Sequence, residues 1–112
     1  MAQTTTIILI PETSQTSNVT ITGETVPAAS YYLGNRNLQT LTWILSDVTA
    51  NISIEATLAE SPAGIDWFQV YSITANTLSE TNYYNIHGNF VWMRAIVHEF
   101  SNGVIQSIKI SY

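Results

Sequence analysis

The C-terminal stretch decides the fold: Phe90-Val-Trp-Met-Arg-Ala-Ile-Val-His-Glu-Phe, then Ser101-Asn-Gly, then Val104-Ile-Gln-Ser-Ile-Lys-Ile-Ser-Tyr112. Two runs rich in β-branched and aromatic residues flank an Asn-Gly pair. This pair is a strong hairpin signal, because both central residues of a type I′ turn need positive φ. The sequence therefore predicts a hairpin around Asn102-Gly103. Its cross-strand partners would be Met93 with Tyr112, Ala95 with Ile110 and Val97 with Ile108.

The two faces of this expected hairpin differ in character. The face that carries Met93, Ala95 and Val97 is wholly apolar and is predicted to be core, because cross-strand neighbours on one face pack together. The opposite face also carries large apolar groups, which a solvated face would not need. A three-residue loop would shift the register by one and exchange the faces that meet. The residues expected at an interface on this second face are Phe90, Trp92, Arg94, Ile96, Phe100 and Ile105.

The composition limits the classes of function. The chain has 112 residues, which suits one domain over residues 1–112 with a single core. Only 10% of the residues are charged and the net charge is −5, which argues against nucleic acid and anionic membranes as partners. There is no cysteine, so disulfides and thiol chemistry are excluded. So low a charge suggests that a partner covers part of the surface.

Short β-rich runs alternate with turn residues along the chain. They predict an all-β fold, a single antiparallel β-sandwich that is jelly-roll-like and has about eight strands. Residues 1–30 are expected either within it or as an arm or edge strand that docks on a neighbour. The expected strands before the C-terminal hairpin are residues 4–10, 18–22, 28–33, 38–45, 51–58, 67–73 and 83–86.

No motif in the sequence carries catalytic chemistry. His87 and His98 lack acidic neighbours at a ligand spacing and are interpreted as surface or turn histidines. Glu60 and Asp66 flank one loop, and a hydrolase that uses them is the weakest of the hypotheses. We therefore expect no enzyme, no catalytic residues, no metal ligands and no cofactor.

Aromatic residues offer a second kind of site. Trp67, Tyr71, Tyr83 and Tyr84 surround the two largest expected loops, and such rings stack on sugars. The alternative is that tryptophans belong to the core and tyrosines to its rim. Arg94 interrupts an apolar strand and needs a carboxylate or carbonyl partner. The alternatives are a buried structural clamp, an intersubunit pair or a ligand contact.

From Leu38 onward the chain resembles small β-sandwich proteins and modules of tailed bacteriophages, notably cyanophages. The resemblance rests on five segments and implies no active-site residues. They are Leu41-Thr-Trp-Ile-Leu, Ile52-Ser-Ile-Glu-Ala-Thr-Leu-Ala, Asp66-Trp-Phe, Asn89-Phe-Val-Trp-Met-Arg-Ala-Ile-Val and Gly103-Val-Ile-Gln-Ser-Ile-Lys-Ile-Ser-Tyr.

The resemblance implies a virion component: a head decoration, or a neck, tail, fibre or baseplate part. We expect a non-enzymatic structural protein, made in the cytoplasm of a host bacterium and assembled into the virion. Its partners would be copies of itself, as a trimer or another homo-oligomer, and other virion proteins. Neither nucleic acid nor membrane is expected. The alternative function is a carbohydrate-binding β-sandwich module that attaches to a host glycan.

Overall fold

The computed structural model describes residues 6–33 and 37–112, which form one antiparallel sheet. The all-β prediction is confirmed. The sheet has seven strands. Four of them pair in the order β1-β7-β5-β6, and the other three, β2, β3 and β4, each pair with β7. The strands are β1 (Thr6–Ile10), β2 (Thr13–Gln15), β3 (Val19–Thr22), β4 (Val26–Pro27), β5 (Leu38–Thr57), β6 (Phe68–His87) and β7 (Trp92–Ser111), with a helical turn α1 (Ser30–Leu33) and a 3₁₀ turn η1 (Gly64–Asp66).

The four short strands act together as one interrupted strand along β7. β1 starts opposite Ser111 near the end of β7, and β4 ends opposite Trp92 at its start. β2 and β3 pair with the segments between. The described part of the expected N-terminal arm therefore pairs with its own chain.

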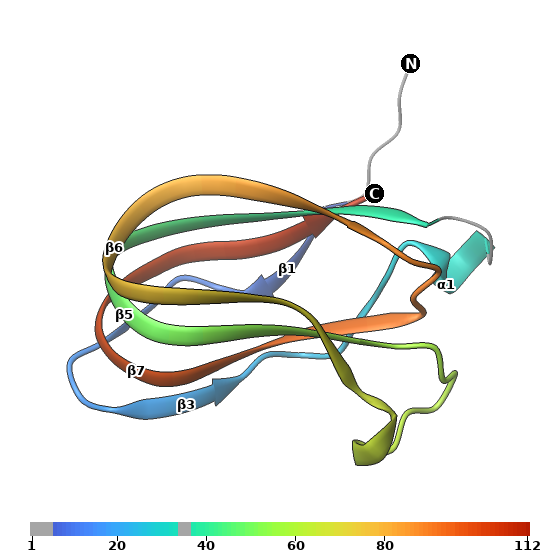
Figure 1. Ribbon diagram of the computed structural model, residues 1–112, viewed down its shortest axis with the longest axis horizontal. Helices are drawn as coiled ribbons and strands as arrows, with labels where there is room; N and C mark the ends of the chain where they lie inside the picture. The colour runs from blue at the N-terminus through green and yellow to red at the C-terminus, as the bar shows by residue number, and fades with distance from the viewer. Residues whose placement is uncertain (1–5, 34–36) are drawn as a thin grey trace.

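β5, β6 and β7 each have 20 residues and each bend back at the same end of the molecule, as nested arches (Figure 1). The bends contain the positive-φ residues Asp47 at 55°, Thr77 at 48° and Glu99 at 53°. The β5 pairing shifts register around its bend. Such bulges increase local twist and bend a strand, so the halves of each strand fold towards one another.

Gly103 belongs to the bend of β7 and not to a hairpin turn. Its φ is 95°, and a Cβ there would lie 2.2 Å from the carbonyl oxygen of Asp47. Asn102 Nδ2 donates to that oxygen at 3.0 Å, so the bends of β5 and β7 are in contact. The predicted hairpin is wrong: β7 runs continuously through Asn102-Gly103, and β5 is its neighbour on one side. Asn102-Gly103 does supply a positive φ, at Gly103, but this residue serves the bend of β7 and not a hairpin turn.

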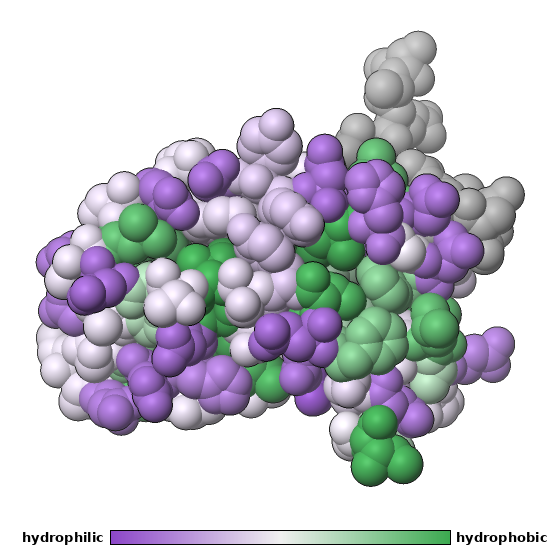
Figure 2. Space-filling view, viewed as in Figure 1, coloured by the Kyte–Doolittle hydropathy of each residue, from purple (hydrophilic) through white to green (hydrophobic). Residues whose placement is uncertain are grey.

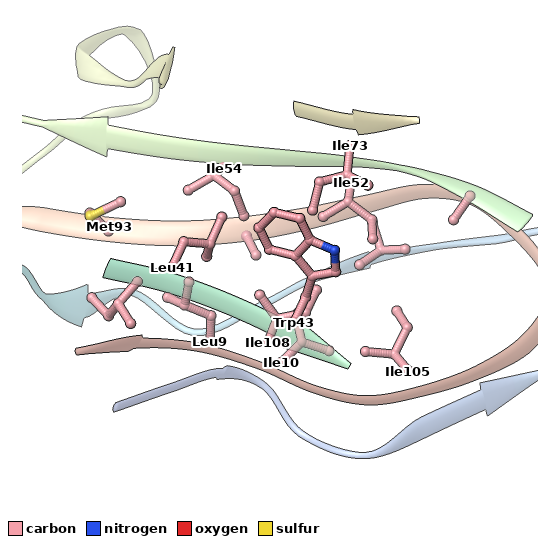
Figure 3. Packing of buried hydrophobic residues seen from close by; sticks show 14 of the residues in the cluster. Leu9, Ile10, Leu41, Trp43, Ile52, Ile54, Ile73, Met93, Ile105 and Ile108 are labelled. Carbon is pink, nitrogen blue, oxygen red and sulfur yellow. The ribbon is translucent and has the colours of Figure 1, made fainter. Parts of the chain in front are cut away.

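The folded sheet encloses one hydrophobic cluster, packed around Trp43, Ile52 and Ile54 (Figure 3). The predicted core positions Met93, Ala95, Val97, Ile108 and Ile110 are all fully buried. Phe100 and Ile105 were expected on the outer face, but both are 0% exposed. The irregular backbone around the bend changes the two-residue alternation, which turns both side chains into the core.

The sequence placed several boundaries wrongly. Three predicted pairs of shorter strands are continuous long strands, because each apparent break is a bend. Residues 30–33 form a helical turn, not a strand, and residues 13–15 form β2 within expected turn material. The prediction of a jelly-roll-like sandwich is not confirmed, since the described strands pair as one sheet.

Candidate functional site

The outer edge of β6 is the most open part of the sheet. β6 pairs with β5 on one side, and no strand of the described residues pairs with its other side, which we call the β6 edge. The strand contains no proline, lysine or arginine. Its one carboxylate, on Glu80, accepts a 2.9 Å hydrogen bond from Trp43 Nε1. Soluble proteins usually protect such edges with lysine, proline or a covering segment.

One side-chain contact indicates which backbone groups face outwards on this edge. The amide of Tyr83 donates to Oδ1 of Asn82 at 2.8 Å, a bond outside the β5 ladder. In an antiparallel pair, alternate residues turn their N–H and C=O away from the neighbour. Thr81 and Asn85 have the same parity as Tyr83 and therefore also present backbone groups to the edge.

Two tyrosines join the two halves of β6. Tyr71 and Tyr84 stack with their ring centroids 4.2 Å apart and an angle of 13° between the ring planes. The ring centroid of Trp43 lies 5.8 Å from that of Tyr71. Offset aromatic pairs add about 1 kcal/mol beyond the area they bury. Along this side, apolar side chains are visible between polar ones (Figure 2). The stack therefore connects the two halves of β6, and Tyr71 packs against the core cluster.

A hollow of about 310 Å³ adjoins this stack at the end of β6. The ring of Phe90 packs over Gly88, where a Cβ would lie 2.3 Å from it, and Phe68 lies 5.7 Å from Phe90. The sequence analysis did not connect Phe68, Asn85 or His87 with a hollow, because only the fold brings the ends of β6 and the start of β7 together. The hollow is lined by Val70, Tyr84, Asn85, Ile86, His87 and Phe90.

Arg94 lies on the outer face of β7 and finds its partners within its own chain. Its Nε donates to Oε1 of Glu55 at 2.7 Å, and the guanidinium lies 4.2 Å from the centroid of the Trp67 ring. The two charged side chains are 24% and 22% exposed. Trp92 Nε1 donates to the carbonyl of Glu60 at 2.9 Å. These contacts fit the clamp alternative: they fasten the 58–67 loop onto β7.

The predicted interface residues are divided between surface and core. Phe90, Trp92, Arg94 and Ile96 are half-buried near the start of β7. Their role at an interface stays a prediction. The other two, Phe100 and Ile105, lie in the core and are not available on the surface.

The four predicted glycan-contact residues do not form one platform. Tyr71 and Tyr84 lie together, whereas Trp67 lies against Arg94. Tyr83 is 63% exposed and points to the opposite face of the sheet from Tyr84. It lies with Ile44 and Lys109 along a second hollow.

The acidic and histidine residues form no cluster of three that could hold a metal among residues 6–33 and 37–112. Asp66 Oδ2 accepts a 2.7 Å hydrogen bond from the amide of Ala63, so one carboxylate of the hydrolase hypothesis is occupied in holding its loop. In the described part of the chain no helix has the length and apolar character to cross a membrane.

Comparison with known proteins gave no assignment: no family model and no curated protein matches the chain. The resemblance to phage proteins is therefore a proposal.

Proposed function

We propose that this chain is a non-enzymatic structural protein that works by assembling with other protein subunits, as a component of a tailed-phage virion. The observation that carries the proposal is the β6 edge, a 20-residue strand without a pairing partner among the described residues. An exposed strand edge is a template for a further strand, and addition of a strand is a common mode of protein recognition.

The surroundings of the edge support this function. Exposed apolar side chains lie along β6 and next to it, where an assembled partner would cover them. They are Phe68 at 42%, Tyr83 at 63%, Tyr84 at 45% and Ile44 at 39% exposed. A virion subunit needs buried contact area more than surface charge, and the chain has only three basic residues. We include in the same proposal that the all-β fold is a jelly-roll-like sandwich.

Co-sedimentation with purified phage particles tests the proposal. The protein is incubated with separated heads and tails of a phage that encodes it, and the bound fraction is measured after centrifugation. We expect saturable binding to one of the two parts. Absence of binding to both, and absence of the chain from the intact virion by mass spectrometry, would contradict the virion role.

A glycan-binding function is the second candidate, and the hollow beside Tyr84 favours it. The aromatic rings of Tyr84 and Phe90 adjoin the polar side chains of Asn85 and His87. This combination suits a sugar ring, which presents apolar C–H groups on its face and hydroxyls at its rim. Titration calorimetry with host polysaccharides tests it. Tyr84→Ala should abolish binding and Tyr83→Ala, which changes the opposite face, should not. If no glycan releases heat, this function is wrong.

A further inference from the structure

The β6 edge is compared first with the other edge of the sheet. That edge, formed by β1 to β4, is interrupted by Pro11 and Pro27, which have no N–H to donate. Their carbonyls are also bonded, because Thr13 Oγ1 donates to Pro11 at 2.8 Å and Tyr112 Oη donates to Pro27 at 2.9 Å. A strand arriving at this edge would find a broken ladder.

Charge separates the two edges as well. The chain has eight acidic and three basic residues, so two copies repel one another over most of their surface. The edge of short strands carries two exposed carboxylates, Glu12 and Glu24. The second half of β6, residues 78–87 after the bend at Thr77, carries one carboxylate. It belongs to Glu80 and already accepts a hydrogen bond from Trp43. Two β6 strands side by side therefore bring few like charges together.

The shape of the molecule indicates where β6 lies. The Cα extents are 40 × 37 × 17 Å. Four strands side by side span three spacings, about 14 Å in total, so the short axis runs across the sheet order. β6 consequently lies on one of the two broad sides.

We propose that the second half of β6 pairs antiparallel with the same segment of a second copy, about a two-fold axis. The inference rests on the proposed assembly function and names its first partner. Thr81, Tyr83 and Asn85 would supply the backbone hydrogen bonds of the joint. Two-fold pairing is self-complementary and closes, so the product is a dimer. The sequence predicts a trimer or another homo-oligomer, and the proposed dimer is one of the latter.

Asn82 competes with the second copy for one backbone donor of this joint. Its side chain occupies the Tyr83 amide, which is one of the donors that the second copy needs. Docking must displace it, at the cost of one hydrogen bond. Removal of the side chain should therefore strengthen pairing, an effect that a purely structural role would not produce.

Sedimentation velocity over a range of concentrations tests the proposal on the full chain. The parent should form a dimer. Thr81→Pro removes an outward N–H, and Thr81→Lys adds a charge to the edge; each should weaken dimerisation by roughly tenfold or more. Asn82→Ala should tighten it a few-fold. Thr20→Lys, at an exposed threonine of β3, is the matched control and should behave as the parent. Circular dichroism checks that each variant is folded.

A parent that stays monomeric at all concentrations, or that forms a trimer, would overturn the dimer. So would a dimer unaffected by both Thr81 variants. These outcomes are separate from the particle-binding result. A monomer that binds heads or tails leaves the proposed function intact and removes the dimer, whereas a dimer that binds neither does the reverse.

Discussion

The two edges of the sheet differ in how far their backbone hydrogen-bonding groups are protected from pairing with another strand. Along β1 to β4, prolines, short strands, carboxylates and side-chain bonds to backbone carbonyls end the ladder. Along β6, 20 residues continue without proline or basic charge, and the one carboxylate is bound internally. The first edge has the features that natural proteins use against aggregation, and the second lacks most of them.

Because the β6 edge is the less protected of the two, we expect a partner strand to pair there and not along β1 to β4. In the proposed dimer, the second half of each β6 edge is paired with its copy and is therefore not available to a third subunit. Two open edges would allow head-to-tail stacking without closure. The predictions below change the closed edge, the connection between the edges and the bonds that seal the closed edge.

Gly23→Ala should break the closed edge and have the largest effect. Gly23 donates its amide to Ala95 at 2.8 Å, and an added Cβ would lie 2.5 Å from the carbonyl oxygen of Leu9. Backbone must move to relieve that contact, so we expect a loss of about 3 kcal/mol in the free energy of unfolding. Urea denaturation measures it.

Gly64→Ala is the matched control, because a Cβ there meets no atom within 4 Å. Its free energy of unfolding should stay within about 0.5 kcal/mol of the parent. Equal losses in the two variants would show that the contact of β1 with the segment after β3 has no special importance.

Gln39→Ala should loosen the connection between the two edges. The side chain is 0% exposed, accepts from the amide of Ala29 at 3.2 Å and donates to the carbonyl of Ile86 at 2.8 Å. Loss of the amide leaves buried backbone groups without partners, so we expect about 2 kcal/mol of destabilisation. Thermal unfolding measures it, with the exposed Gln69→Ala as a control expected to change little. A loss below that of the control would mean that water replaces the amide without cost.

Tyr112→Phe should give the smallest effect of the three. It removes the hydroxyl that bonds the carbonyl of Pro27 and keeps the ring. We expect about 1 kcal/mol of destabilisation from the lost hydrogen bond. Thr20→Val, at an exposed threonine of β3, is the control for a hydroxyl removed at the surface. Hydrogen exchange of the Val26 amide, the single backbone N–H of β4, should rise in Tyr112→Phe alone, and an unchanged rate would contradict a sealing role.

The sequence located the turn signals well and misread what they do. The expected strand over residues 38–45 ends before Ser46-Asp47, and Asn102-Gly103 is predicted to be a hairpin turn, yet both pairs lie inside continuous strands. A left-handed residue permits a hairpin turn or a bulge, and local sequence does not distinguish them. Only the long-range pairing of β5 with β6 and β7 decides, and no local pattern records that pairing.

The candidate site was predictable in part. Alternation over residues 51–58 predicts that Ile52, Ile54, Ala56 and Leu58 face the core and that Thr57 faces water. The first three are buried, but Leu58 is 61% exposed and Thr57 only 1%, because the alternation ends with β5. The need of Arg94 for a carboxylate pointed to a partner that the fold supplies as Glu55. The open edge was not predictable. It depends on which strand lies last in the sheet, and that order is a property of the topology, not of the residues in β6.

The bends also determine where the chain tolerates change. Because every long strand turns back at one end, the connections between β5 and β6 and between β6 and β7 both lie at the opposite end (Figure 1). A peptide inserted or a protease cut at those connections interrupts no strand. At the bent end, the same change would cut a strand in half. A tag or reporter placed between residues 58 and 66 would therefore leave the ladders intact.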